Sequence, residues 1–98
     1  MTQGELFPVE YKVRVVNIRT EWQVPYIYVG RPTVWGNPWK AGEDGTREEV
    51  IARYRAWIET RQDLLRWLRR DMERLGVDAL GCWCAPKPCH ADVLAELL

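Results

Sequence analysis

The sequence predicts a small single α/β domain, with a three-stranded or slightly larger, mostly parallel sheet packed with two to three helices. Three runs rich in β-branched and aromatic residues indicate strands, and three stretches with apolar residues at helical spacing indicate helices. They follow the order strand, strand, helix, helix, strand, helix along 98 residues, which suits one domain. No linker divides the chain, so we expect residues 1–10 to form a flexible tail and residues 11–98 the domain.

The predicted strands differ in pattern. Residues 11–18 alternate apolar and charged side chains, as a half-buried strand does. Residues 26–29 are continuously apolar, which is typical of a strand covered on both faces. We expect residues 26–29 and 77–83 to be central strands. If these two are parallel neighbours, the loops that follow them emerge at the same sheet edge and face each other across one cleft.

Helix boundaries are marked by capping residues. Thr46 and Glu49 form a capping box that starts a helix ending near Thr60. A second helix begins at Thr60 or Asp63 and stops at Gly76; whether residues 46–75 form one bent helix or two is open. The expected inner face of the first consists of Val50, Ile51, Tyr54, Trp57 and Ile58, and that of the second of Leu64, Leu65, Leu68, Met72 and Leu75.

Charge gives little guide to a partner, because 14 basic residues balance 14 acidic ones. Arg66, Arg70 and Arg74 recur on the outer face of the second helix, where they would meet phosphates or form a solvated face with the acidic residues between them; we favour the solvated face. No apolar run is long enough to span a membrane, and no basic region precedes an apolar one at the N-terminus. We expect a cytoplasmic protein without a membrane partner.

A rigid loop follows the second strand. Residues 30–39 contain two glycines and two prolines, and they carry Arg31, Trp35, Asn37 and Trp39. Loops at the ends of buried strands hold ligand contacts in α/β folds. Arg31 would bind a phosphate, Asn37 would read a polar edge, and the indoles would stack on a base. Equally, the tryptophans would pack over the core as part of a connection.

The stretch from Cys82 to His90 holds all three cysteines and the only histidine. Pro86 and Pro88 keep it non-helical, so Cys89 and His90 fall at the first turn of a helix over residues 91–98. Backbone N–H groups there favour an anion or a thiolate. In a reducing compartment these cysteines are expected to be free, metal-bound or reactive.

Both motif stretches closely resemble an uncharacterised family of small bacterial, archaeal and phage proteins, classed as a domain of unknown function. The residues that carry the resemblance are Tyr28-x-Gly30-Arg31-Pro32-x-x-Trp35-Gly36-Asn37-Pro38, Thr46-Arg47-Glu48-Glu49 with Tyr54, and Leu80-x-Cys82-Trp83-Cys84-x-Pro86-x-x-Cys89-His90-Ala91-Asp92-x-Leu94. The resemblance implies no activity. The last motif is also similar to the end of another uncharacterised α/β family, whose motif reads Cys-His-Arg. In the present sequence Ala91 replaces that arginine.

Two kinds of chemistry remain open for the cysteine stretch. Cys82, Cys84, Cys89 and His90 supply the sulfurs and the imidazole that a structural zinc accepts, although Cys-x-Cys spacing and adjacent Cys-His are unusual for a zinc module. Alternatively, Cys89 with a lowered pKa and His90 as a general base would act in a pocket for a nucleotide or nucleic acid, with Trp83 stacking on the base. Whether the protein is an enzyme is left open.

The N-terminal tail suggests another class of function. Gln3, Leu6 and Phe7 resemble the Gln-x-x-Leu-Phe peptide by which many bacterial replication and repair proteins dock on the sliding clamp. Such a peptide buries two apolar side chains in a groove. The alternative function is therefore a phage-type interaction module that docks on host replication machinery, with structural cysteines.

Overall fold

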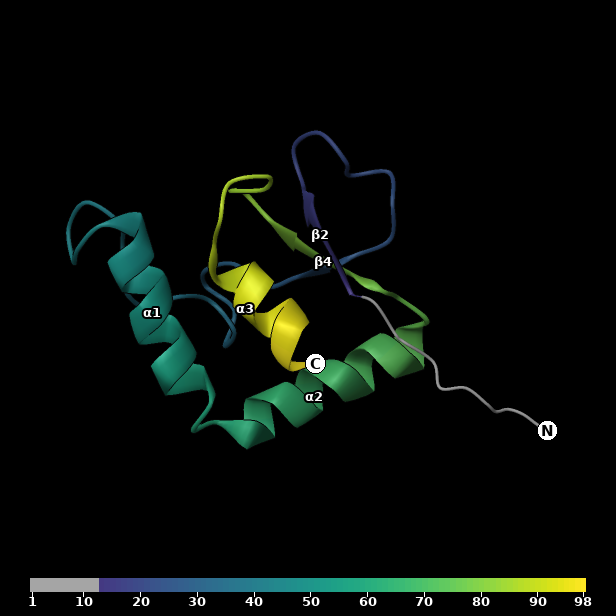
Figure 1. Ribbon diagram of the computed structural model, residues 1–98. Helices are drawn as coiled ribbons and strands as arrows, with labels where there is room; N and C mark the ends of the chain where they lie inside the picture. Colours follow the sequence, from purple (N-terminus) through teal and green to yellow (C-terminus); the bar gives the residue numbers. More distant parts are fainter. Residues whose placement is uncertain (1–12) are drawn as a thin grey trace.

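The computed structural model describes residues 13–98 and confirms the predicted α/β fold (Figure 1). Within that range the element order is the predicted one. The elements are β2 (Arg14–Asn17), β3 (Ile27–Tyr28), α1 (Arg47–Ile58), α2 (Gln62–Leu75), β4 (Ala79–Cys82) and α3 (His90–Leu97). None of the helices in residues 13–98 is long and apolar enough to cross a membrane.

Within residues 13–98 the sheet has three strands in the order β2-β4-β3, and both outer strands run parallel to β4. All of β4 is buried, so its prediction as a central strand is confirmed. The same prediction for residues 26–29 is wrong. Among the described residues β3 is a two-residue edge strand, half-buried, and it pairs through Ile27 and Tyr28 with Leu80 and Gly81.

The apolar run around β3 is explained by neighbours that the sequence pattern does not reveal. Val29 is fully buried in the core, and Ile27 packs against that core from the edge. A Cβ atom on Gly81 would collide with the ring of Tyr26. Glycine at this position therefore lets the tyrosine ring close over the sheet.

Capping chemistry sets the helix boundaries as predicted. The Thr46 side chain accepts a hydrogen bond from the backbone N–H of Glu49, and the Glu49 carboxylate accepts one from the backbone N–H of Thr46. Gly76 ends α2 in the left-handed conformation, with φ of 69°. Leu75 was expected on the inner face but is 55% exposed, because this last residue of the helix extends beyond the core.

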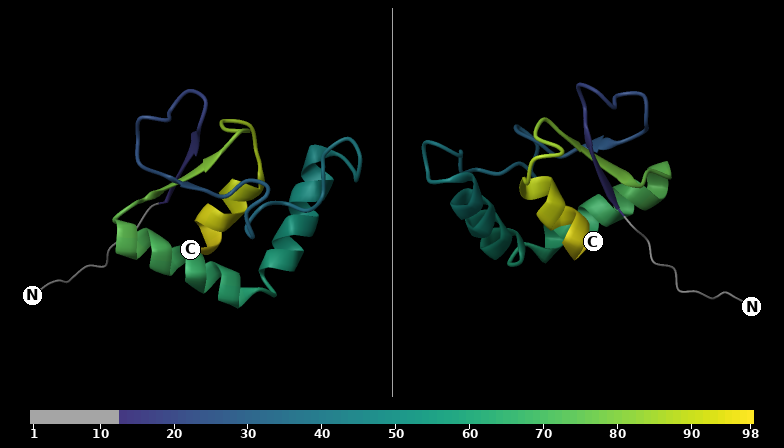
Figure 2. Two further views of the ribbon diagram at one scale, coloured as in Figure 1. Left: turned by 180° about the vertical axis from the view of Figure 1, so that it is seen from behind. Right: turned by 45° about the horizontal axis from the view of Figure 1, so that its top comes forward.

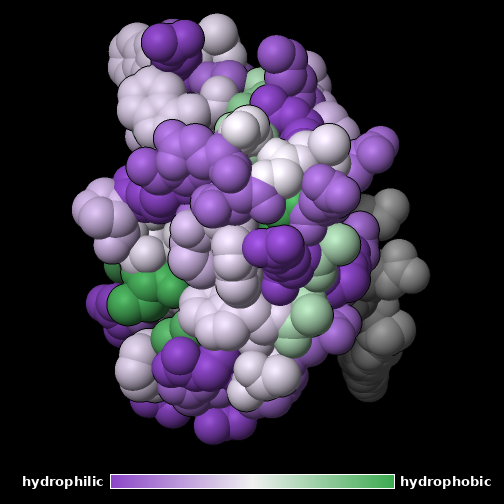
Figure 3. All heavy atoms as spheres, turned by 90° about the vertical axis from the view of Figure 1, so that its left-hand side faces the viewer, coloured by the Kyte–Doolittle hydropathy of each residue, from purple (hydrophilic) through white to green (hydrophobic). Residues whose placement is uncertain are grey.

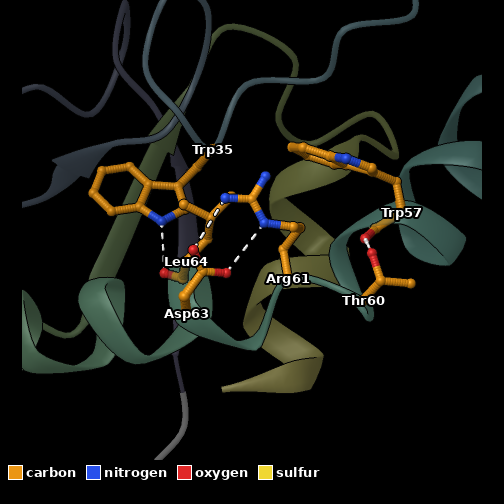
Figure 4. Close-up of polar contacts among 6 residues, drawn as sticks. All are labelled: Trp35, Trp57, Thr60, Arg61, Asp63 and Leu64. Carbon is orange, nitrogen blue, oxygen red and sulfur yellow. Dashed lines mark hydrogen bonds and ion pairs between the residues drawn. The ribbon is translucent and has the colours of Figure 1, made fainter.

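Two separate helices occupy residues 46–75, and they meet at Arg61 (Figure 4). The Arg61 guanidinium lies between the indoles of Trp35 and Trp57 and pairs with Asp63 at 3.0 Å. Trp35 Nε1 donates to the Leu64 carbonyl oxygen at 2.9 Å, in the first turn of α2. This junction ties the loop after β3 to the helical frame.

The helices α1 and α2 meet at an angle and enclose α3, as the three ribbon views show (Figures 1 and 2). α3 packs against both α1 and the sheet. The C-terminus lies by α2, where Arg69 Nη2 donates to the Leu98 carbonyl oxygen at 3.2 Å. Seen from the α1 side, the surface is mostly hydrophilic with small hydrophobic patches (Figure 3).

Candidate functional site

The candidate site lies where the parallel strands end. We call residues 30–39 the glycine–proline loop and residues 82–90 the cysteine loop. His90 Nε2 bonds the Val29 carbonyl oxygen at 2.8 Å, and Trp83 Nε1 donates to the Tyr28 hydroxyl at 3.0 Å. The two loops therefore emerge side by side at one sheet edge, which confirms the predicted juxtaposition.

A pocket of about 510 Å³ opens between the two loops and the start of α1. Its volume falls in the ordinary range of small-molecule sites. Its charged side chains are three basic and one acidic. The lining residues are Tyr28, Gly30, Arg31, Asn37, Trp39, Lys40, Ala41, Glu43, Arg47, Val50, Ile51, Cys82, Trp83, Cys84, Cys89 and His90.

Asn37 serves mainly to hold the glycine–proline loop. It is only 7% exposed. Its Nδ2 donates to the Val50 carbonyl oxygen at 3.2 Å, and its Oδ1 accepts from the Trp39 backbone N–H at 2.9 Å. Arg31 Nη1 in turn donates to the Asn37 carbonyl oxygen at 2.8 Å. The amide that was predicted to read a ligand already bonds backbone at both of its ends.

Trp35, predicted to contact a ligand, does not line the pocket. It packs against the core, with its indole N–H bonded to α2 and its carbonyl oxygen accepting from the hydroxyl of Tyr54. The next residue is a glycine, Gly36, because a Cβ atom at this position would come within 3.0 Å of the Arg31 backbone. The loop thus folds back on itself around an anchored tryptophan.

Trp39 and Trp83 line the pocket, and their stacking on a base stays a prediction. Trp39 is half-buried and meets Trp57 edge to face, with ring centroids 6.4 Å apart. Trp83 is 54% exposed, and the Cζ atom of Arg19 lies 5.4 Å from its ring centroid. The hydrogen bond to Tyr28 fixes the orientation of the Trp83 indole.

Two of the cysteines form a buried pair. The Sγ atoms of Cys82 and Cys89 are 3.4 Å apart, close enough to share a proton. This hydrogen bond from Cys89, with backbone hydrogen bonds from Ala85 and Cys84, lowers the pKa of the Cys82 thiol to about 6 against the opposing effect of burial.

The thiol of Cys89 responds in the opposite direction. Its bond to Cys82 and its burial raise its pKa, which reverses the lowered value expected from its helix position alone. A proton shared by two adjacent sulfurs favours ionisation of one of them and opposes ionisation of the other. The sequence did not predict the raised pKa of Cys89, because it does not show which cysteines lie in contact.

The start of α3 is closed by its own capping box. Asp92 Oδ2 accepts from the backbone N–H of Cys89 at 3.0 Å, and the Cys89 carbonyl oxygen accepts from the backbone N–H of Asp92 at 3.0 Å. Two donors expected to bind an anion are therefore already used within the chain. The basic side chains of the pocket are the better candidates for binding a negative group.

His90 is a buried, neutral imidazole. Burial is the main cause that lowers its pKa, and the nearby Arg31 charge adds to the effect, while the bond to Val29 and the charge of Asp92 oppose it. A carbonyl oxygen only accepts, so Nε2 carries the hydrogen and Nδ1 of the neutral ring is the acceptor. The ring packs edge-on against Tyr54, with centroids 5.1 Å apart.

The predicted zinc ligands are not assembled as a metal site. Within residues 13–98, no three His, Cys, Asp or Glu side chains are placed to hold a metal ion. Cys82 and Cys89 face each other, whereas His90 Nε2 is bonded to Val29.

Sequence reasoning missed several residues that shape the site. Asn17, at the end of β2, donates through Nδ2 to the carbonyl oxygens of Trp83 at 3.1 Å and Ala85 at 2.7 Å. Arg47 Nη1 reaches from α1 to the Pro88 carbonyl oxygen at 3.2 Å and lines the pocket. The signal for Arg47 was its place in the helix-start motif beside Thr46; nothing marked Asn17 beyond its position at a strand end.

Comparison with known proteins places the chain in a family. The model of a domain of unknown function (DUF4326) matches residues 15–98. The uncharacterized 12.4 kDa protein of the nrdA-td intergenic region of Enterobacteria phage T4 is 34% identical over 73 residues, which cover 74% of this chain and 66% of the phage protein, slightly less than two thirds of its length. No solved structure matches. Since the family model matches most of the chain, including both motif loops, this protein belongs to the DUF4326 family.

Proposed function

We propose that the protein binds a nucleotide, either free or as part of a nucleic acid, in the pocket between its two motif loops. The observation that carries the proposal is the make-up of that pocket. It lies at the carboxyl ends of parallel strands, where α/β proteins bind ligands, and it combines three basic side chains with an exposed indole.

The phosphate is assigned to Arg31, Lys40 and Arg47. Glu43 is the one acidic residue among the lining residues, so the charge of the pocket favours an anion. Each of the two arginines lines the pocket and uses one nitrogen to bond a backbone carbonyl oxygen, which fixes the orientation of its guanidinium. A guanidinium has five N–H donors and can therefore still bind a phosphate.

The base is assigned to Trp83. Its ring is more than half exposed, and its orientation is fixed by the bond to Tyr28. Stacking of a base on such a ring contributes about 1–3 kcal/mol. Trp39, half-buried against Trp57, forms another aromatic part of the pocket lining. Catalytic roles for Cys89 and His90 stay predictions that this binding function does not require.

Calorimetric titration of the full chain with nucleoside mono-, di- and triphosphates, and with short single-stranded DNA and RNA, tests the proposal. Nucleosides and inorganic phosphate form the comparison arms. We expect phosphate-bearing nucleotides to bind more tightly than either arm, and the oligonucleotides to show whether a free or a linked nucleotide is preferred. No binding by any nucleotide or oligonucleotide would refute the proposal.

Matched variants locate the binding. Trp83→Ala should weaken it about tenfold or more, from the loss of stacking, whereas Trp67→Ala, 51% exposed on α2 and outside the pocket lining, should not. Arg47→Ala should weaken it too, and Arg53→Ala, exposed on the same helix, should not. Equal losses in a variant and its control would place the ligand elsewhere.

We propose docking on the sliding clamp as a second function, supported by the Gln3, Leu6 and Phe7 pattern. These positions lie outside the described residues. Clamp capture by the full chain should be lost when Leu6 and Phe7 are changed to alanine and retained in Glu5→Ala, which alters a variable position of the motif. Capture that survives the double change would exclude the peptide as the docking element.

Zinc binding is a separate proposal, supported by the number and type of side chains in the cysteine loop and opposed by their arrangement. Elemental analysis of the purified protein checks it. One equivalent of zinc would mean that these side chains rearrange around the metal, and its absence would leave the thiols to other chemistry.

A further inference from the structure

The Cys82–Cys89 pair is held ready to form a bond. Cys82 ends β4 and Cys89 directly precedes α3, so two regular elements position the two sulfurs. Their Sγ atoms are 3.4 Å apart. A disulfide requires an approach to about 2.05 Å, so a shift of little more than an ångström, shared between the two side chains, would join them.

Backbone donors surround both sulfurs. Hydrogen bonds from the backbone of Cys84 and Ala85 reach Cys82, and one from the backbone of Ala91 reaches Cys89. Donors of this kind stabilise a thiolate, which is the form that reacts with oxidants. The pair thus has both the geometry and the polar surroundings of a reactive dithiol.

Access to the pair is selective for small molecules. Both residues line the pocket, yet Cys82 and Cys89 are only 1% and 4% exposed. Cys84 lines the same pocket and is more exposed. A bulky reagent would therefore reach Cys84 first, whereas an oxidant the size of water would also reach the buried pair.

We propose that Cys82 and Cys89 form a modification site at which a peroxide generates a reversible intramolecular disulfide. This inference is independent of any nucleotide ligand. It also differs from a catalytic Cys89 acting with His90, because the reacting partners are two thiols and the oxidant.

The chemistry balances with hydrogen peroxide. The Cys82 thiolate sulfur attacks one peroxide oxygen, an S–O bond forms, and the O–O bond breaks to release hydroxide, which takes up the proton that Cys82 lost. Cys89 sulfur then attacks the sulfenic acid sulfur, so that the S–S bond forms and the S–O bond breaks. The leaving hydroxide takes the Cys89 proton as water. Two electrons pass from the thiols to the peroxide, and two waters result.

Thiol counting by intact mass tests this. The reduced full chain is exposed to peroxide, with and without a chelator, then unfolded and alkylated. We expect one of the three cysteines to be alkylated and the mass to be lower by two hydrogens, with dithiothreitol restoring all three. The disulfide should form about tenfold faster or more in the folded chain than in urea, because folding pre-positions the thiols.

Single variants identify the pair. Cys84→Ser should form the disulfide at the same rate, and Cys82→Ser and Cys89→Ser should form none. Circular dichroism would report whether the last two fold. Three alkylated thiols after peroxide treatment of the folded chain, or loss of the disulfide in a folded Cys84→Ser protein, would overturn the proposal. Disulfide formation only after chelation would overturn it too, since a bound metal would then be the normal occupant of the thiols.

Discussion

The glycine–proline loop and the cysteine loop border the same pocket, but they are held in place by different means. The first is fixed by its own side chains, with Trp35 bonded to α2 and Asn37 bonded to α1. The second is fixed largely by side chains from elsewhere, since Asn17 and Arg47 bond its carbonyl oxygens. The cysteine loop therefore leaves Trp83 and Cys84 to face the pocket.

This difference separates scaffold from surface. An amide, an arginine and two indoles in one rigid loop suggest ligand recognition, yet the amide, the arginine and one of the indoles also hold the loop in place. Such a pattern of polar and aromatic residues thus has two physical explanations, and only the bonds made by each side chain distinguish them. The following changes test that distinction, in order of decreasing effect on stability.

The largest expected difference in stability is between Trp35→Ala and Trp83→Ala. Removing Trp35 deletes core packing and the bond to Leu64, so we expect the free energy of unfolding to fall by about 3 kcal/mol. Removing the exposed Trp83 should cost less than about 1 kcal/mol. Urea unfolding measures both. Similar losses in the two variants would contradict the division into scaffold and surface.

Asn37→Ala should have the next largest effect. It leaves the Trp39 N–H without its acceptor in a half-buried loop, at an expected cost of about 1–3 kcal/mol. The control is Gln62→Ala, an exposed amide that bonds the Glu59 carbonyl oxygen and should change stability by no more than about 0.5 kcal/mol. If Asn37→Ala were as stable as the control, its amide would be available to a ligand.

The smallest effect is the pH dependence from His90, the only histidine. Burial lowers its pKa in the folded state, so the unfolded chain binds a proton more readily. The contribution of neutral His90 to the free energy of unfolding is therefore complete above about pH 6.5. It falls as the pH drops below that value, by at most about 1.4 kcal/mol per pH unit.

Urea unfolding between about pH 5 and 7 compares the wild type with His90→Gln. The variant should show a shallower decline towards low pH. Ionisation of Cys82 also favours stability at higher pH, but it contributes to both proteins and cancels in the comparison. Equal slopes would show that His90 is not buried as a neutral ring.

Local signals predicted the fold well, whereas side-chain partners had to come from the structure. The Thr46 capping box and the Gly76 stop are short-range chemistry, and both mark the boundaries correctly. The edge position of β3 was missed because an apolar run does not tell a central strand from an edge strand covered by Tyr26 and the core.

The site was predictable in position but not in detail. Parallel pairing of β3 and β4 brings the two loops together, which strand order alone suggested. The sequence did not indicate that Cys82 would face Cys89 or that Trp35 would face α2, since these contacts depend on the relative placement of distant elements. The roles of Arg47 and Asn17 in the site were not predicted for the same reason.

The most direct test is a nucleotide titration followed by amide NMR of the full chain. We predict that signals from residues 30–39 and 82–90 shift together and fit one binding curve, since both loops line one pocket. Shifts confined to one loop, shifts located elsewhere, or none at saturating nucleotide would contradict a shared binding site.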